Sequence, residues 1–127
     1  MVKRYFDVNV FVYYLTGHPE FADRAEYWFI NTEEIYTSEI TFYQLIVIIS
    51  YLLKENPIEV MKKVAEALEN LNVIFIHMEP SELIEIYNVS KKFDLDFEDS
   101  IHFYCALRNN CEIISNDADM KKLGAKF

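Results

Sequence analysis

Short apolar runs of β-type residues alternate with helical segments along the whole chain, and this order constrains the fold more than any other feature. Strands are expected at residues 2–6, 35–37, 73–76 and 111–115. Strands separated by helices normally form a parallel sheet with helices on both faces. We therefore predict an α/β fold, a three-layer α/β/α sandwich with a parallel sheet, as one domain over residues 1–127.

The expected helices lie between these strands, at residues 9–15, 19–31, 39–53, 57–71, 81–93 and 97–109, with a short helical turn near the C-terminus. Asp7 or Asn9 can cap the first helix, and Ser38 can cap the third. Pro19 is expected in the first turn of the second helix. The segment 40–53 carries no charge for 14 residues. A membrane span needs about 20 apolar residues, so this segment is expected to be a core helix whose first turns, up to Gln44, face the site.

Composition excludes some functions. The chain has only two glycines, Gly17 and Gly124, so it lacks the glycine-rich loop that cradles nucleotide phosphates. The net charge of −9 repels nucleic acids in general. A nucleic-acid activity would need metal ions or local basic patches, and two groups of candidates exist: Lys3 with Arg4, and the set Lys121, Lys122 and Lys126.

The N-terminal sequence MVKRYFDVNV carries charges where a secretory signal peptide would be apolar. We expect a cytoplasmic protein that does not interact with a membrane.

Three aspartates fall where a parallel sheet would bring them to one edge. Asp7 follows the first strand, Asp117 follows the last strand, and Asp99 lies in the first turn of the preceding helix. Clustered carboxylates repel one another unless a cation lies between them, and Mg²⁺ or Mn²⁺ prefers oxygen ligands. Each aspartate could instead be a helix cap or a residue that favours a helix N-terminus, and the spacing alone leaves both interpretations open.

Four segments extend this pattern: YFDVNVFVYYL, TSEITFYQL, DFEDSIHFYCAL and CEIISNDADM. In order and spacing they resemble the motifs of PIN domains, especially the VapC-type toxin ribonucleases. The resemblance covers nearly the whole chain. It implies a PIN-like α/β/α sandwich, with "AKF" at the end of the chain as the stub of a last edge strand. It also implies an Mg²⁺- or Mn²⁺-dependent nuclease with four clustered acidic residues.

Carried over by position, the resemblance makes Asp7, Asp99 and Asp117 the catalytic residues and metal ligands. Asn9, Ser115 and Asn116 match polar residues that support these acids, and Asp119 is a further supporting candidate. The position of the fourth acid, normally a glutamate, is occupied by Gln44, which brings no charge. Neither Glu39 nor Glu98 is expected to compensate, because helix geometry turns each away from the site.

The sequence is compatible with two functions. The first is a metal-dependent endoribonuclease of the PIN/VapC toxin type, which would need no histidine as a base and would have RNA as its substrate. The second is a PIN-like domain that lost its chemistry with Gln44 and binds RNA or protein. The resemblance also implies a small antitoxin as partner, and the many aromatic and Ile residues suit a homodimer interface.

A third interpretation, a phosphoacceptor or phosphatase related to receiver domains, fits poorly. Receiver domains need an acidic pair after the first strand and a lysine near the last strand. This chain has a single acid at Asp7 and no lysine between Leu107 and Met120.

Overall fold

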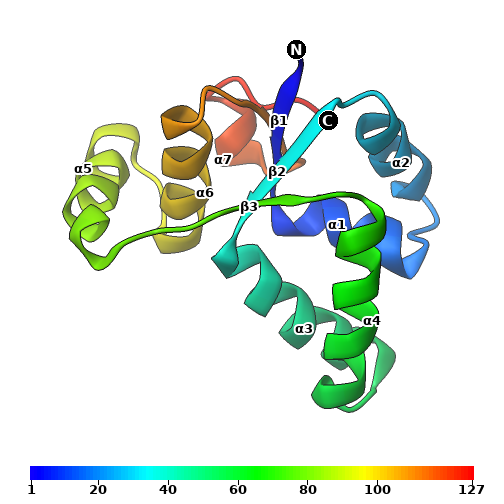
Figure 1. Cartoon of the computed structure of the whole chain (residues 1–127). Coiled ribbons are helices and arrows are strands. Elements are labelled where there is room, and N and C mark those ends of the chain that lie inside the picture. The colour runs from blue at the N-terminus through cyan, green and yellow to red at the C-terminus, as the bar shows by residue number, and fades with distance from the viewer.

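The computed structural model describes residues 1–127 and contains one four-stranded sheet flanked by helices (Figure 1). The strands are β1 (Lys3–Phe6), β2 (Glu34–Ser38), β3 (Ile74–Ile76) and β4 (Glu112–Ile114). All neighbouring strands are parallel, in the order β3-β2-β1-β4. The chain therefore moves outward from β1 to β3 and then returns to the other side of β1. In a parallel sheet such a reversal opens a crevice at the carboxyl ends of the two strands, here β1 and β4.

The helices connect the strands in the expected order. They are α1 (Val8–Thr16), α2 (Ala22–Ile30), α3 (Glu39–Leu53), α4 (Pro57–Asn70), the 3₁₀ turn η1 (Pro80–Glu82), α5 (Leu83–Phe93), α6 (Phe97–Arg108) and α7 (Ala118–Lys121).

Two hydrophobic clusters lie on opposite faces of the sheet. One contains Phe6 and Ile114 with apolar residues of α1 to α4, and the other contains Tyr5 and Ile113 with residues of α5 and α6. Adjacent strand residues point to opposite faces, so Tyr5 and Phe6 enter different cores. Figure 1 shows α1 to α4 on one side of the strands and α5 and α6 on the other. The predicted three-layer α/β/α sandwich is confirmed.

The uncharged segment forms most of α3. Leu45 and Ile49 are buried in the first core, whereas Tyr43, Val47 and Tyr51 are exposed along another face of the helix. No helix combines the length and apolar character that crossing a bilayer requires.

The start of the second helix and the cap of the third differ from what the sequence predicts. The second helix begins at Ala22, not in the turn that contains Pro19, because the Nδ1 atom of His18 accepts the backbone amides of Glu20 and Phe21 and holds them in a turn. Ser38 precedes α3 but does not cap it with its side chain. Its hydroxyl is instead hydrogen-bonded to the Tyr5 hydroxyl at 2.7 Å inside the protein.

The end of the chain extends the sheet by one residue. Ile114 and Lys126 form an isolated parallel bridge beside β4. The Lys126 amide donates to the Ile113 carbonyl, and the Ser115 amide donates to the Lys126 carbonyl. The final residues are thus the stub of an edge strand, as predicted, and they support the chain just before Asp117.

Candidate active site

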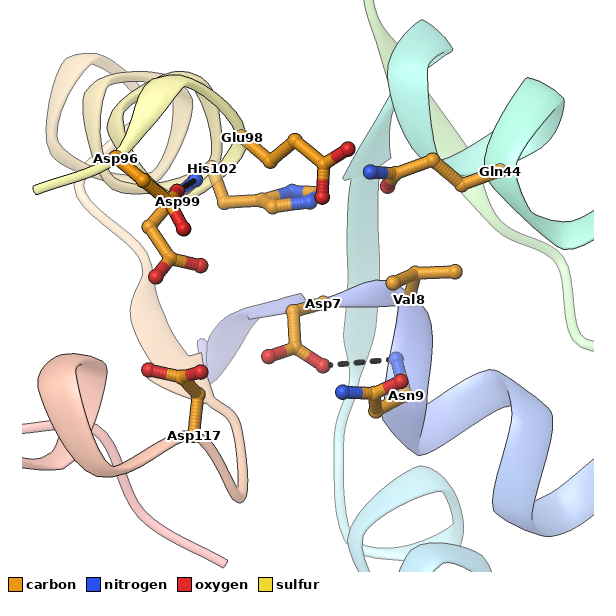
Figure 2. Close-up of a pocket in the computed structure, with 9 residues that line it drawn as sticks. All are labelled: Asp7, Val8, Asn9, Gln44, Asp96, Glu98, Asp99, His102 and Asp117. Carbon is orange, nitrogen blue, oxygen red and sulfur yellow. Dashed lines mark hydrogen bonds between the residues drawn. The ribbon is translucent and has the colours of Figure 1, made fainter. Parts of the chain in front are cut away.

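A polar pocket opens where the carboxyl ends of β1 and β4 meet the first turns of α3 and α6 (Figure 2). Its volume is about 130 Å³, room for a few water molecules or for an ion with part of its hydration shell. One lining residue, Val8, is apolar, and no lysine or arginine lines it. The lining residues are Asp7, Val8, Asn9, Gln44, Asp96, Glu98, Asp99, His102 and Asp117.

Asp7 stands at the turn from β1 to α1 and is 5% exposed. Its Oδ1 atom accepts the amides of Asn9 and Val10, at 3.0 and 3.4 Å, so it caps α1 as one interpretation of the sequence suggested. Its Oδ2 atom accepts the hydroxyl of Ser115. Burial raises the pKa of Asp7 to about 6 despite these hydrogen bonds. The carboxylate is therefore held rigidly in a site that lacks a positive charge.

Asp117 follows β4 and caps α7 by accepting the amides of Asp119 and Met120 with Oδ1. Its own amide donates to the Ser115 hydroxyl oxygen at 3.1 Å. Ser115 thus connects the two strand-end aspartates. Carboxylate oxygens of Asp99, Asp117 and Asp119 lie within 4.8 Å of one another.

Asp99 comes to the pocket from α6, the helix that packs across the sheet. Asp96 caps α6 by accepting the Asp99 amide at 2.8 Å, so the carboxylate of Asp99 is free to enter the pocket. Burial and the nearby charge of Asp117 raise the pKa of Asp99 to about 7. Two carboxyls with raised pKa values in one pocket indicate an arrangement that is unfavourable until a cation or a proton is added.

Gln44 enters the pocket from α3, opposite α6. Its Oε1 atom is buried and has no hydrogen-bond partner. His102, on α6, is 2% exposed, and its Nε2 atom is also buried without a partner. The Nδ1 atom of His102 is hydrogen-bonded to the Tyr5 hydroxyl at 2.6 Å. Burial lowers the pKa of His102 to about 4, so its ring is neutral near pH 7.

The expectation that Glu98 turns away from the site is wrong. Glu98 lines the pocket, and Figure 2 shows its carboxylate pointing toward Gln44. A helix angle of about 100° separates the Cα–Cβ directions of Glu98 and Asp99, but the longer glutamate side chain bends back into the pocket. The position that lacks a charge on α3 is therefore faced by a charge from α6.

Of the remaining polar residues considered from the sequence, some line the pocket and others point elsewhere. Asn9 lines the pocket beside Asp7. Asn116 does not: its amide nitrogen lies 3.3 Å from the Tyr13 hydroxyl, and its Oδ1 accepts from Lys121 at 2.8 Å. Glu39 is directed elsewhere, as expected, and accepts the Met78 amide. Asn116 thus braces the loop rather than the acids.

The donor set fits a hard divalent cation. Its oxygen donors are the carboxylates, the uncharged Oε1 of Gln44 and the side chain of Asn9. It has no sulfur ligand, and it carries several negative charges with no lysine or arginine among them. The unpartnered Oε1 of Gln44 offers a further oxygen that could be satisfied by an ion or by its water.

Sequence reasoning missed three lining residues, Asp96, Glu98 and His102. A signal for them existed in the spacing. Glu98 and His102 are four residues apart, and Asp99 and His102 are three apart, which are the separations that bring side chains together on a helix. Placing Asp99 in the site therefore implied that His102 lies beside it.

Comparisons with known proteins agree with this architecture. The family model named PIN domain matches residues 4–126. No curated protein sequence matches the chain. Solved structures match it along almost its whole length, at identities that establish the fold alone.

Three of these structures come from bacteria. The sarcin–ricin loop cleaving toxin VapC20 of Mycobacterium tuberculosis is 11% identical with a TM-score of 0.80, over 96% of this chain and 95% of that one. A toxin–antitoxin complex from Klebsiella pneumoniae is 17% identical with a TM-score of 0.75, over 98% and 95%. VapBC2 of Rickettsia felis, bound to a promoter DNA fragment, is 16% identical with a TM-score of 0.70, over 100% and 96%. With a family match across residues 4–126, the chain belongs to the PIN domain family.

Proposed function

We propose that this protein is a metal-dependent endoribonuclease of the VapC toxin type, which hydrolyses phosphodiester bonds in RNA. The observation that carries the proposal is that Asp7, Asp99 and Asp117 line one pocket that has no lysine or arginine. Membership of the PIN family and the likeness to a toxin described as cleaving the sarcin–ricin loop support the same function.

Asp7, Asp99 and Asp117 would hold Mg²⁺ or Mn²⁺, with Asp119 and Glu98 close enough to contribute through water. A bound divalent cation supplies positive charge that polarises a phosphodiester and acidifies water. The residues of the chain fix where this charge sits. Ser115 holds one oxygen of Asp7 and the backbone amide of Asp117, and the amides of α7 hold the Asp117 carboxylate, so both carboxylates have fixed orientations.

An acidic protein must still attract RNA. Lys3 and Arg4 do not help, because they are the first two residues of β1 and lie at the opposite end of the strand from the pocket. Arg4 is also paired with Glu112. Lys121 and Lys122 are better placed, since they end the short helix that Asp117 caps. Both are exposed, and they could bind phosphates that flank the cleaved bond.

A cleavage assay tests the proposal. Purified protein is incubated with a mixture of structured and single-stranded RNAs in Mn²⁺ or Mg²⁺, and the products are sequenced. We expect cleavage that requires the metal and that Asp99→Asn abolishes. Equal products from the wild type and from Asp99→Asn, or no products from any RNA, would contradict the proposal.

Gln44 supports one alternative, a PIN domain that binds RNA or protein without cutting. A neutral amide at the fourth position lowers the charge that holds cations. Titration calorimetry with Mn²⁺ separates the two functions: binding is expected for the nuclease, and its absence would favour the alternative.

The proposal extends to partners and location. The structural neighbours include a toxin–antitoxin complex and VapBC2, so we include a small antitoxin partner.

An apolar groove lies beside the pocket. Ile40 and Tyr43 of α3 and Ile101 of α6 line it, together with Met78 and Leu83. An apolar antitoxin helix could fill this groove and place an arginine among the acids. Such a system operates in the cytoplasm, with residues 1–127 acting as one domain.

A homodimer is the second assembly that we include. Tyr43, Val47 and Tyr51 recur every four residues on α3 and are 64%, 68% and 82% exposed, so they form an apolar stripe on one face of the helix. A stripe of this kind suits packing against a second copy.

A further inference from the structure

Two uncharged polar atoms in the pocket lack any partner, although both are buried: Oε1 of Gln44 and Nε2 of His102. Folded proteins pair nearly all buried polar atoms, and each exception calls for an explanation. The acid cluster does not explain this pair. A metal-binding role suits Gln44 Oε1, but the Nε2 atom of His102 must first be assigned as a donor or an acceptor.

A buried chain of hydrogen bonds decides the role of His102. The Tyr5 hydroxyl lies 2.7 Å from Ser38 Oγ and 2.6 Å from His102 Nδ1. If Ser38 donates to Tyr5 and Tyr5 donates to Nδ1, both hydroxyl hydrogens are used. The reverse order turns the Ser38 hydrogen toward the sulfur of Cys105, which is a weak acceptor, so the first order makes the better set of hydrogen bonds. The first order places the ring hydrogen on Nε2, so His102 presents a neutral N–H donor to the pocket.

The two atoms therefore form a complementary pair, an acceptor on α3 and a donor on α6. A phosphate or carboxylate oxygen only accepts hydrogen bonds and would leave Gln44 Oε1 unsatisfied. A hydroxyl group both donates and accepts, so a hydroxyl placed between α3 and α6 has the chemistry that both atoms require. A nucleobase edge could do the same, but no aromatic residue lines the pocket to stack a base, apart from the imidazole of His102 itself.

Resting on the proposed nuclease function, we propose that Gln44 and His102 bind a ribose 2′-hydroxyl of the substrate next to the acid cluster and thereby select RNA over DNA. DNA lacks this hydroxyl and would leave both buried atoms unpaired. The glutamine that departs from the family pattern then has a function of its own, because its amide oxygen accepts a hydrogen bond without adding a charge.

The test compares ribose with deoxyribose in cleavage and in binding. Cleavage is measured on an RNA and on the same RNA with one deoxyribose at the nucleotide beside the cut. Binding of short random-sequence RNA and DNA is measured by fluorescence anisotropy in Mn²⁺, with Asp99→Asn, so that the result does not depend on turnover. For the wild-type protein, with Gln44 and His102 both present, the loss of one 2′-hydroxyl from the substrate is expected to reduce the cleavage rate by about 10- to 100-fold.

Gln44→Met is the informative variant. Methionine has a similar length and suits a helix, but its sulfur accepts hydrogen bonds only weakly, so the ratio between cleavage of the ribose and of the deoxyribose substrate should fall toward one. Asn88→Met is the matched control, an amide replaced on the exposed face of α5, and it should keep the full ratio. His102→Phe should act like Gln44→Met, and its melting curve shows whether it is folded.

The outcomes are distinct. The selection of RNA would be overturned if Asp99→Asn binds RNA and DNA equally well and the wild type cleaves the ribose and deoxyribose substrates at equal rates. The nuclease function would still stand. An unchanged ratio in Gln44→Met would overturn the role of Gln44. If no RNA is cut, the nuclease function fails, and the binding ratio still decides whether the pair recognises ribose.

Discussion

The carboxylate of Glu98 points toward the amide of Gln44 across the pocket, from the helix that carries Asp99 (Figure 2). The negative charge expected on α3 from the family pattern is absent, because that position is Gln44, and the negative charge of Glu98 on α6 lies opposite it. This arrangement shifts negative charge across the pocket rather than removing it, and it leads to two predictions.

Replacing Glu98 by Gln should weaken Mn²⁺ binding, because the pocket then loses the acid that faces Gln44. We expect the Kd from titration calorimetry to rise by about 10-fold, the lower range for removing a group that supports a metal site. Glu66→Gln, on the exposed face of α4, is the control and should leave the Kd unchanged. An identical Kd in both variants would show that Glu98 has no part in holding the ion.

Replacing Gln44 by Glu should have opposite effects with and without metal. Two facing carboxylates repel, so the free energy of unfolding of the metal-free protein should fall by about 1–4 kcal/mol. With saturating Mn²⁺ the melting temperature should rise more than it does for the wild type. Thermal unfolding in EDTA and in Mn²⁺ measures both effects, and a variant that is stabilised in EDTA would refute the prediction.

The stability of the metal-free protein should fall as pH rises from 4 to 7. The pKa of Asp7 is about 6 and that of Asp99 about 7, both above the ordinary value of 3.8 for an aspartate. The folded state therefore binds more protons than the unfolded state in this range, and the free energy of unfolding decreases with pH. For buried Asp7, a shift of about two pKa units corresponds to about 3 kcal/mol.

Urea unfolding in EDTA at pH 5 and pH 7.5 checks this dependence. Asp7→Asn should flatten it, because asparagine does not titrate and can still accept the capping amides. Mn²⁺ should cancel or reverse the slope by favouring the charged carboxylates. A wild-type protein that gains stability between these two pH values in EDTA would contradict the pKa directions.

Ser38→Ala should destabilise the protein by about 1–2 kcal/mol, because the buried Tyr5 hydroxyl loses one of its two partners. Urea unfolding measures the difference. Ser81→Ala, in the exposed turn before α5, should cost little in comparison. Equal stabilities would mean that Ser38 contributes nothing to holding Tyr5 and His102.

The double variant Val47→Lys/Tyr51→Lys should be monomeric if the α3 stripe forms a homodimer interface. Light scattering after size-exclusion chromatography gives the mass of the wild type and the variant. Ile84→Lys places a charge on an exposed apolar position of α5 and should leave the mass unchanged. A wild-type protein that is monomeric at high concentration would remove the dimer from the proposal.

The parts of the fold and site that were predictable depend on local pattern and simple topology. Alternating strands and helices specified the parallel sheet, and parallel strands align their carboxyl ends, which brought Asp7 and Asp117 together. The start of α2 was not predictable in this way, because it depends on the side chain of His18 accepting two amides.

The place of His102 in the pocket was not predictable for a similar reason. Its orientation depends on a hydrogen bond to Tyr5 of β1, which lies 97 positions away in the sequence. Tyr5 is in turn hydrogen-bonded to Ser38 of β2, 33 positions away from it. Glu98 was missed because the helix angle was applied to the whole side chain, whereas it fixes only the direction of the first bond.

Asp7, Asp96 and Asp117 each cap a helix with a carboxylate oxygen. Asparagine can make the same cap, and a single transition converts either aspartate codon into an asparagine codon. A folded protein that lacks one of these charges is therefore one point mutation away at each position. Under the proposed function, a population of cells that loses cleavage through such mutations would keep an intact protein that still binds the proposed partners.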